Sequence, residues 1–252
     1  KSALELLWLM GKIVVVDRIG FTRVYDLMDR AVPSKYLDKS VDAEEVWRYF
    51  LQRAVDCLAV ASITDVLGYF SFSVYALDKG RSRKGTIKEK VQVLEREDII
   101  AEIDVEGSMN PHYIYRDNLA LLEKVRNGEP LESHAWFLSP FDNVVWNRER
   151  VRRLFNADVR LEAYVPKAKR QFGYFVMPII WNNQIIGRLD PKVDRREHTL
   201  TLVNFELTLP KEEWGDALDA IREELAAFMS FHECEQLVIN RCKPAGLKNL
   251  LK

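Results

Sequence analysis

Residues 172–189, FGYFVMPIIWNNQIIGRL, contain the strongest local signal in the chain. Two apolar runs flank the dipeptide Asn182-Asn183, and asparagine tolerates the positive φ angles that a type I′ turn requires. This pattern predicts a β-hairpin. Two further stretches, VRLEAYV and TLTLVNFEL, alternate apolar and polar residues as strands do. We therefore expect strands over 159–165, 172–181, 184–189 and 199–207.

A helix is predicted after these strands. Pro210 suits the first turn of a helix, and apolar residues then recur on one stripe at Trp214, Leu218 and Ile221. We expect residues 131–252 to form an antiparallel, barrel-like β module that ends with this helix. The predicted fold class is α+β.

The first residues have the pattern with which a winged-helix unit ends. Leucines recur at helical spacing over residues 1–10, Gly11 stops the helix, and two short strands follow. We expect 1–30 to be the end of one such unit. Because no Met precedes Lys1, which already lies in a helical pattern, we also expect further elements upstream.

A second unit of the same kind is predicted over residues 31–130. Three helical stretches, with Asp42, Ser62 and Thr86 as expected N-caps, precede two alternating stretches that bracket a turn. The order helix, helix, helix, hairpin is that of a helix-turn-helix with a wing. Tandem winged-helix units followed by the β module are the expected architecture.

The composition excludes several classes of protein. With 252 residues and 48% hydrophobic residues the chain can bury a core, and its longest apolar run, 175–181, is too short to span a bilayer. The three cysteines form no Cys-x-x-Cys motif, which favours a reduced, cytoplasmic protein. We expect no metal site.

The formal net charge of −1 conceals strongly charged segments. Residues 146–196 carry a net charge of +7 and residues 79–90 a net charge of +5, whereas 206–235 carry −7. Phosphates are neutralised locally, by a basic face rather than by the total charge. The near-neutral sum therefore does not exclude a nucleic-acid partner.

Residues 138–192 carry a family resemblance. The stretches LSPFDNVVWNRERVRRLF, RLEAYVPKAKRQFGYFVMPIIW and IIGRLDPK, together with GKIVVVDRIGFTRVYDLMDRAVP at 11–33, occur in order. They resemble the winged-helix superfamily of crosslink-repair DNA glycosylases, the YcaQ and AlkZ type, and are most similar to the YcaQ branch. The resemblance is weak over 60–110 and after 205.

The resemblance implies a C-shaped protein around a basic channel for duplex DNA. Its implied activity is hydrolysis of the N-glycosidic bond of N7-alkylated purines, including purines in interstrand crosslinks, without metal or cofactor. The implied partner is alkylated or crosslinked double-stranded DNA, with no membrane involved. The implied location is cytoplasmic and associated with the nucleoid.

The chain departs from this family at the catalytic motif. The family uses Gln-x-Asp or Gln-x-Gln in its first winged-helix unit, and none of the five glutamines of this sequence stands in such a motif. No catalytic residue is therefore carried over. We expect the motif upstream of Lys1, and we expect residues 1–252 alone to be inactive.

The candidate DNA contacts lie in the two basic segments. Basic side chains bind phosphates, and a neighbouring aromatic ring can stack on bases or wedge between them. The alternatives are solvated surface, ion pairs within the protein and, near Gly80 and Gly85, a mobile loop. The expected contacts are Lys84, Lys88, Lys90, Arg148, Arg152, Lys167, Lys169, Arg170, Tyr174, Arg188 and Lys192.

Asp142 allows two interpretations. As a pocket carboxylate it could stabilise an oxocarbenium-like centre, as carboxylates do in glycoside hydrolysis. Alternatively its side chain caps the turn that follows. Asp190 has the same ambiguity, with an ion pair to a nearby arginine as its structural interpretation.

Two other classes of function remain open from the sequence. A non-catalytic winged-helix regulator would bind DNA with sequence preference and have no catalytic motif upstream. A protein-interaction module that uses the acidic C-terminal helix would bind no DNA, or bind it without salt dependence. A glycosylase should instead bind duplexes with little sequence preference and strong salt dependence.

Overall fold

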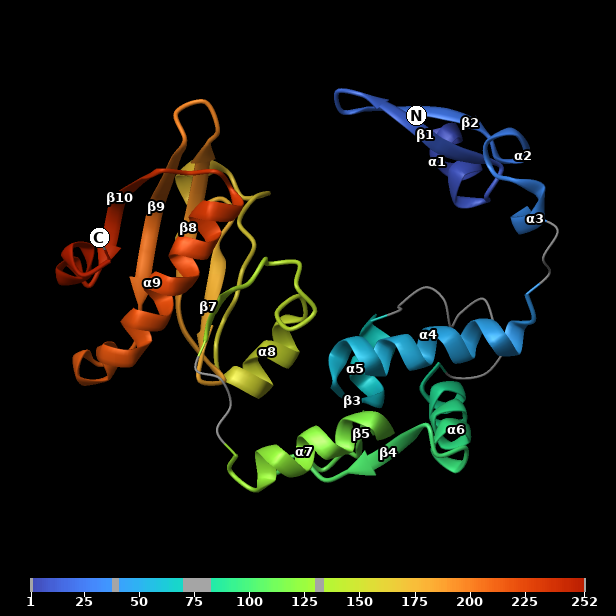
Figure 1. Ribbon diagram of the computed structural model, residues 1–252. Helices are drawn as coiled ribbons and strands as arrows, with labels where there is room; N and C mark the ends of the chain where they lie inside the picture. Colours follow the sequence, from blue (N-terminus) through green and yellow to red (C-terminus); the bar gives the residue numbers. More distant parts are fainter. Residues whose placement is uncertain (1, 38–40, 70–82, 130–133, 252) are drawn as a thin grey trace.

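The computed structural model describes residues 2–37, 41–69, 83–129 and 134–251. Three groups of secondary-structure elements follow one another along an arc (Figure 1). The first group holds a two-stranded sheet, the middle group a three-stranded sheet, and the last group a five-stranded sheet. The α+β class expected from the sequence is confirmed.

The first group is a helix followed by a hairpin, as expected. Helix α1 (Ser2–Leu9) precedes strands β1 (Ile13–Ile19) and β2 (Thr22–Leu27), which pair antiparallel. Gly20 makes the turn between the strands with a φ of 60°, a value that glycine adopts without strain. Two short helices, α2 (Met28–Ala31) and α3 (Ser34–Leu37), lead onward.

The middle group has the expected three helices and hairpin, with one strand that the sequence did not predict. In chain order its elements are α4 (Ala43–Leu58), β3 (Val60–Ser62), α5 (Ile63–Tyr69), α6 (Arg83–Arg96), β4 (Ile100–Ile103), β5 (His112–Tyr115), η2 (Arg116–Asn118) and α7 (Leu119–Arg126). Strand β3 pairs with β5, so the sheet order is β3-β5-β4. Apolar residues of the helices, among them Leu51, Val55, Val91 and Leu94, form one buried core with Ile100.

The expected helix caps of this group have different outcomes. Ser62 and Asp65 form a reciprocal capping box: the Asp65 amide donates to Ser62 Oγ at 3.2 Å and the Ser62 amide to Asp65 Oδ2 at 2.9 Å. Asp42 is the N-cap of α4 but makes no side-chain capping bond. The prediction for Thr86 is wrong, because α6 already begins at Arg83 and residue 86 lies inside it.

The last group is an open sheet covered by one long helix. Its strands β6 (Ala135–Phe137), β7 (Met177–Trp181), β8 (Gln184–Asp194), β9 (Thr199–Leu207) and β10 (Gln236–Lys243) lie in the order β10-β9-β8-β7-β6. Helix α9 (Trp214–Phe231) lies across this sheet (Figure 1) and buries Leu218, Ile221 and Leu225 against it. The helices α8 (Arg148–Phe155), η3 (Lys167–Lys169), η4 (Lys211–Glu213) and η5 (Ala245–Asn249) complete the group.

Four features of this group differ from the sequence predictions. The strand predicted over 172–181 begins only at Met177, and residues 172–176 form a loop. The sheet is not a closed barrel, because β10 and β6 are its two edges. It is not purely antiparallel, since β10 runs parallel to β9. Residues 159–165 form no strand, because the segment turns back on itself with the Val165 amide donating to the Glu162 carbonyl at 2.9 Å.

The turn of the predicted hairpin is confirmed. Trp181 pairs with Gln184 at the end of β7 and β8, and Asn182 and Asn183 have φ angles of 48° and 59°. Both angles lie in the left-handed region that a type I′ turn needs, which asparagine tolerates better than most residues. The central strand β8 and its neighbour β7 thus follow from local sequence.

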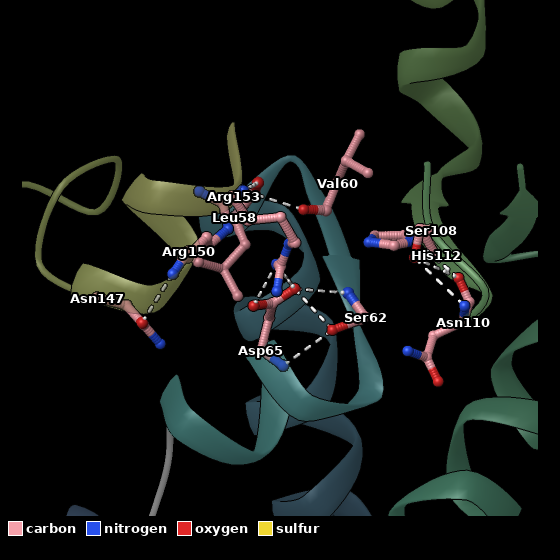
Figure 2. Close-up of polar contacts among 10 residues, drawn as sticks. All are labelled: Leu58, Val60, Ser62, Asp65, Ser108, Asn110, His112, Asn147, Arg150 and Arg153. Atoms are coloured by element: carbon pink, nitrogen blue, oxygen red, sulfur yellow. Dashed lines mark hydrogen bonds and ion pairs between the residues drawn. The ribbon is translucent and has the colours of Figure 1, made fainter. Parts of the chain in front are cut away.

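Helix α8 joins the middle group to the last group (Figure 2). Arg150 is buried, and its Nη2 donates to the carbonyls of Leu58 at 2.8 Å and Val60 at 3.0 Å. These carbonyls flank Ala59, whose φ of 58° is unusual for alanine. Arg150 therefore stabilises the sharp turn between α4 and β3 from the other group.

A second arginine of α8 binds the capping box itself. Arg153 Nη2 lies 2.8 Å from both carboxylate oxygens of Asp65, which is buried. Burial raises the pKa of Asp65, but its bonds with Arg153 and Ser62 together bring the pKa below its ordinary value. The α8 helix that makes these contacts is capped at its N-terminus by Asn147, whose side chain accepts the Arg150 amide.

We predict that Arg150→Met lowers the free energy of unfolding by about 2–3 kcal/mol, because two buried carbonyls lose their donor. Urea denaturation measures this loss. Arg148→Met removes the same charge from an exposed position of the same helix and should change the free energy by less than about 0.5 kcal/mol. Equal effects of the two substitutions would contradict the structural role of Arg150.

Candidate nucleic-acid interface

A buried glutamate binds the backbone amides of the first residues of the loop over 171–175. Glu162 is 5% exposed, and its carboxylate accepts the backbone N–H groups of Gln171, Phe172 and Gly173 at distances of 2.8–3.2 Å. Three consecutive amides that converge on one anion form a compact anion-binding concavity. Here the loop forms the concavity, and the anion that occupies it is the carboxylate of Glu162.

Asp190 of β8 holds the second half of the same loop. Its carboxylate is buried and accepts the amides of Tyr174 and Phe175, each at 3.0 Å. An added Cβ at Gly173 would lie 2.1 Å from Asp190 Oδ2, so this position requires glycine. The interpretation of Asp190 as an ion-pair partner of an arginine is therefore replaced by one in which it anchors the loop.

The charge of Glu162 depends on these amides. Burial raises the pKa of Glu162, but the N–H groups of Phe172, Gln171 and Gly173 outweigh it and hold the pKa below its ordinary value. At neutral pH the carboxylate is therefore ionised and binds the loop in its stronger, charge-assisted form.

Basic residues surround a hollow beside this loop. The hollow has a volume of about 720 Å³ and is lined by Lys167, Arg170, Gln171, Phe172, Gly173, Tyr174, Asp190, Pro191, Lys192, Val203, Asn204, Asn240 and Arg241. The structure thus brings together four of the predicted DNA contacts, Lys167, Arg170, Tyr174 and Lys192. Lys169 lies in η3 between Lys167 and Arg170 and is exposed.

Most of these basic side chains form no ion pair with another described residue of the protein. Among the described residues, no carboxylate lies within ion-pair distance of Lys167, Lys169 or Lys192. Arg170 donates from Nε to the Val165 carbonyl at 2.9 Å and lies 4.9 Å from the centre of the Tyr174 ring. Its guanidinium is thereby oriented while Tyr174 stays largely exposed.

The other predicted contacts of this half of the chain lie elsewhere. Arg148 is exposed on α8, and Arg152 of the same helix pairs with Asp158 at 3.0 Å. Arg188 lies over the Phe172 ring and pairs with Glu206 at 2.8 Å. Arg188 borders a second, smaller hollow, about 300 Å³ in volume, that Phe172 also lines.

The predicted lysines of α6 belong to the middle group. Lys88 is exposed, whereas Lys90 pairs with Glu44 at 3.1 Å and lies 4.3 Å from the centre of the Trp47 ring. The side chain of Lys84 and the segment around Gly80 lie outside the described residues. A role of these lysines in DNA binding stays a prediction.

Asp142 makes the contact expected of a turn cap. Its Oδ1 accepts the Val144 amide at 2.8 Å, and it lines neither of the two hollows described above. In the described part of the chain, no group of three or more His, Cys, Asp or Glu side chains could hold a metal ion. No helix of that part is long and apolar enough to cross a membrane.

Sequence reasoning missed three residues of this interface. The alternation over 159–165 places Glu162 in a strand, although a glutamate in an apolar stretch, nine residues before Gln171, is a signal for a buried anchor. Asn240 and Arg241 were missed because β10 was not predicted. The alternation in QLVINRCK, residues 236–243, was the available signal.

We predict that the loop loses stability in acid through Glu162. Because the pKa of Glu162 is lowered in the folded state, its contribution is present above its ordinary value of 4.5 and is lost as the pH falls below that value. Glu162→Gln should cost about 1–3 kcal/mol at pH 7 and remove this part of the pH dependence, as urea denaturation at several pH values would show.

Glu149→Gln is the matched control for this prediction, because Glu149 is exposed on α8. It should leave both the stability and its pH dependence nearly unchanged. If Glu162→Gln behaved like Glu149→Gln, the assignment of Glu162 as the anchor of the loop would be wrong.

Comparison with known proteins identifies the family. No solved structure matches the chain. A family model described as DNA glycosylase AlkZ-like matches residues 1–231, which is most of the 252-residue chain and includes the anchored loop and α9. The resemblance seen in the sequence is therefore confirmed: the chain belongs to the AlkZ-like family of DNA glycosylases.

Proposed function

We propose that this chain is the DNA-binding body of a repair glycosylase that excises N7-alkylated purines, including purines in interstrand crosslinks. The observation that carries the proposal is the family match over residues 1–231. Further support comes from the basic hollow beside residues 171–175, where several exposed cations and an exposed tyrosine lie together. Such a surface suits duplex DNA, whose charge lies on its backbone.

The arrangement of the middle group supports winged-helix units as the DNA-binding architecture. Three helices with a three-stranded sheet in the order β3-β5-β4, and a hairpin of β4 and β5 at the end, are what such a unit requires. We assign residues 31–130 to one unit and residues 1–30 to the end of another. We assign residues 131–252 to a sheet-and-helix module, and its described part, 134–251, carries the basic hollow.

The catalytic motif is the part that this chain does not supply. No glutamine of residues 1–252 stands in Gln-x-Asp or Gln-x-Gln. We therefore place the residues that activate water or stabilise the sugar cation in sequence upstream of Lys1. The reaction itself needs neither metal nor cofactor in this proposal, because an N7-alkylated purine carries a positive charge and is already a good leaving group.

We predict that the full-length protein releases N7-methylguanine from duplex DNA and leaves alkali-labile abasic sites, whereas residues 1–252 bind the same duplex but release no base. Strand cleavage by brief, mild alkali measures the abasic sites, and the N7-methylguanine duplex treated in the same way without protein gives the background, because N7-methylguanine is itself labile to hot alkali. Undamaged duplex of the same sequence is the control substrate.

Each outcome tests a separate part of the proposal. Absence of base release by the full-length protein would overturn the glycosylase function and favour a DNA-binding regulator. Base release by residues 1–252 alone would instead show that the catalytic residues lie within this chain. Crosslinked duplex as a second substrate tests unhooking independently of the monoadduct.

A further inference from the structure

We propose that the hollow beside residues 171–175 is a binding site for a DNA backbone phosphate, completed by Asn240 and Arg241 of β10. The inference rests on the proposed function and adds to it a specific site and two residues. Both residues lie beyond residue 231, where the family match ends. They reach the hollow because β10 runs parallel to β9, with Arg241 opposite Asn204.

The charge of the hollow suits a phosphate. Lys167, Arg170, Lys192 and Arg241 line it, and Asp190 is the one acidic residue among the residues described as lining it. The carboxylate of Asp190 is buried and already accepts the amides of Tyr174 and Phe175. The cations therefore outnumber the single acid, whose own charge is balanced by the loop.

The nearest acidic neighbour on β9 does not compete for these cations. Glu206 lies two residues beyond Asn204 and is paired with Arg188 at 2.8 Å and with Lys243 at 3.1 Å. No described carboxylate lies within ion-pair distance of Arg241 or Lys192, and both are exposed. Two cations from different strands, Lys192 of β8 and Arg241 of β10, are thus available in the same hollow.

The side chains around these cations are of the kinds that contact DNA phosphates. Lysine and arginine contact phosphate oxygens as charged donors, and the Asn240 amide adds a neutral donor of the kind found at phosphates. The hollow lies on a rigid sheet beside an anchored loop, so little ordering is needed on binding. A contact of this kind positions the duplex and carries no sequence information.

The experiment measures binding of a short undamaged DNA duplex to residues 1–252 by fluorescence anisotropy, between about 50 and 200 mM salt. Arg241→Ala and Lys192→Ala should each weaken binding by about threefold to tenfold at low salt, equally for unrelated sequences. Each should also make the slope of log K against log salt less negative by about 0.9, the value of one lost phosphate contact.

Lys124→Ala is the matched control, since Lys124 is an exposed lysine of α7 far along the chain from the hollow. It removes the same unit charge and should leave the slope unchanged. A second arm adds inorganic phosphate at constant ionic strength. If phosphate binds the hollow and competes with the duplex less for Arg241→Ala than for the wild type, the site is a phosphate site.

The outcomes separate this inference from the proposed function. Wild-type slopes for Arg241→Ala and Lys192→Ala, with the wild type still binding DNA, would overturn the inference and leave the glycosylase function standing. If Arg241→Ala and Lys192→Ala lost no more affinity than Lys124→Ala, the inference would likewise be overturned, because the loss would then come from the change in net charge alone. Absence of DNA binding by the wild type would count against the proposed function itself.

Discussion

Five consecutive backbone amides, from Gln171 to Phe175, donate to two buried carboxylates. Glu162 takes the first three amides and Asp190 the last two. A loop of five residues cannot satisfy so many amides by itself, and buried amides without partners would each cost about 1–3 kcal/mol. The two carboxylates therefore determine the path of this loop.

The anchored loop connects the sheet to the proposed DNA-binding surface. Asp190 belongs to β8, the central strand of the five-stranded sheet, so the loop is tied to the most buried part of the module. Asn204 of β9 adds a bond from its side-chain amide to the Phe172 carbonyl at 2.6 Å. Lys167, Arg170 and Lys192 consequently stand at defined positions of a rigid frame, which suits a surface that must fit a duplex.

Local signals in the sequence were sufficient for much of the fold. The Asn182-Asn183 turn, the capping box of Ser62 and Asp65 and the apolar stripe of α9 depend on residues close together in the chain, and all three are present. The parallel strand β10 and the absence of a strand at 159–165 depend on partners far away. Periodicity alone cannot show that Glu162 turns toward Gln171 or that β10 lies beside β9.

The candidate site could likewise be predicted only where its residues lie close together in the sequence. Basic residues near aromatic ones in 167–174 indicated a nucleic-acid surface, and the structure places most of them around one hollow. The contacts of α8 with the middle group have no local signal in the sequence. In them Arg150 and Arg153 donate to Leu58 and Asp65, which lie more than 80 residues earlier in the chain. The buried guanidinium of Arg150 retains one N–H, at Nε, without a partner among the described residues.

The central claim is that two carboxylates hold the loop, and amide hydrogen exchange of residues 171–175 tests it most directly. In the native protein these amides should exchange far more slowly than in an unstructured peptide. In Glu162→Gln, residues 171–173 should lose most of this protection, while the amides of Tyr174 and Phe175, held by Asp190, should keep it. Exchange at the unstructured rate in the native protein, or a uniform response of all five amides, would contradict the account.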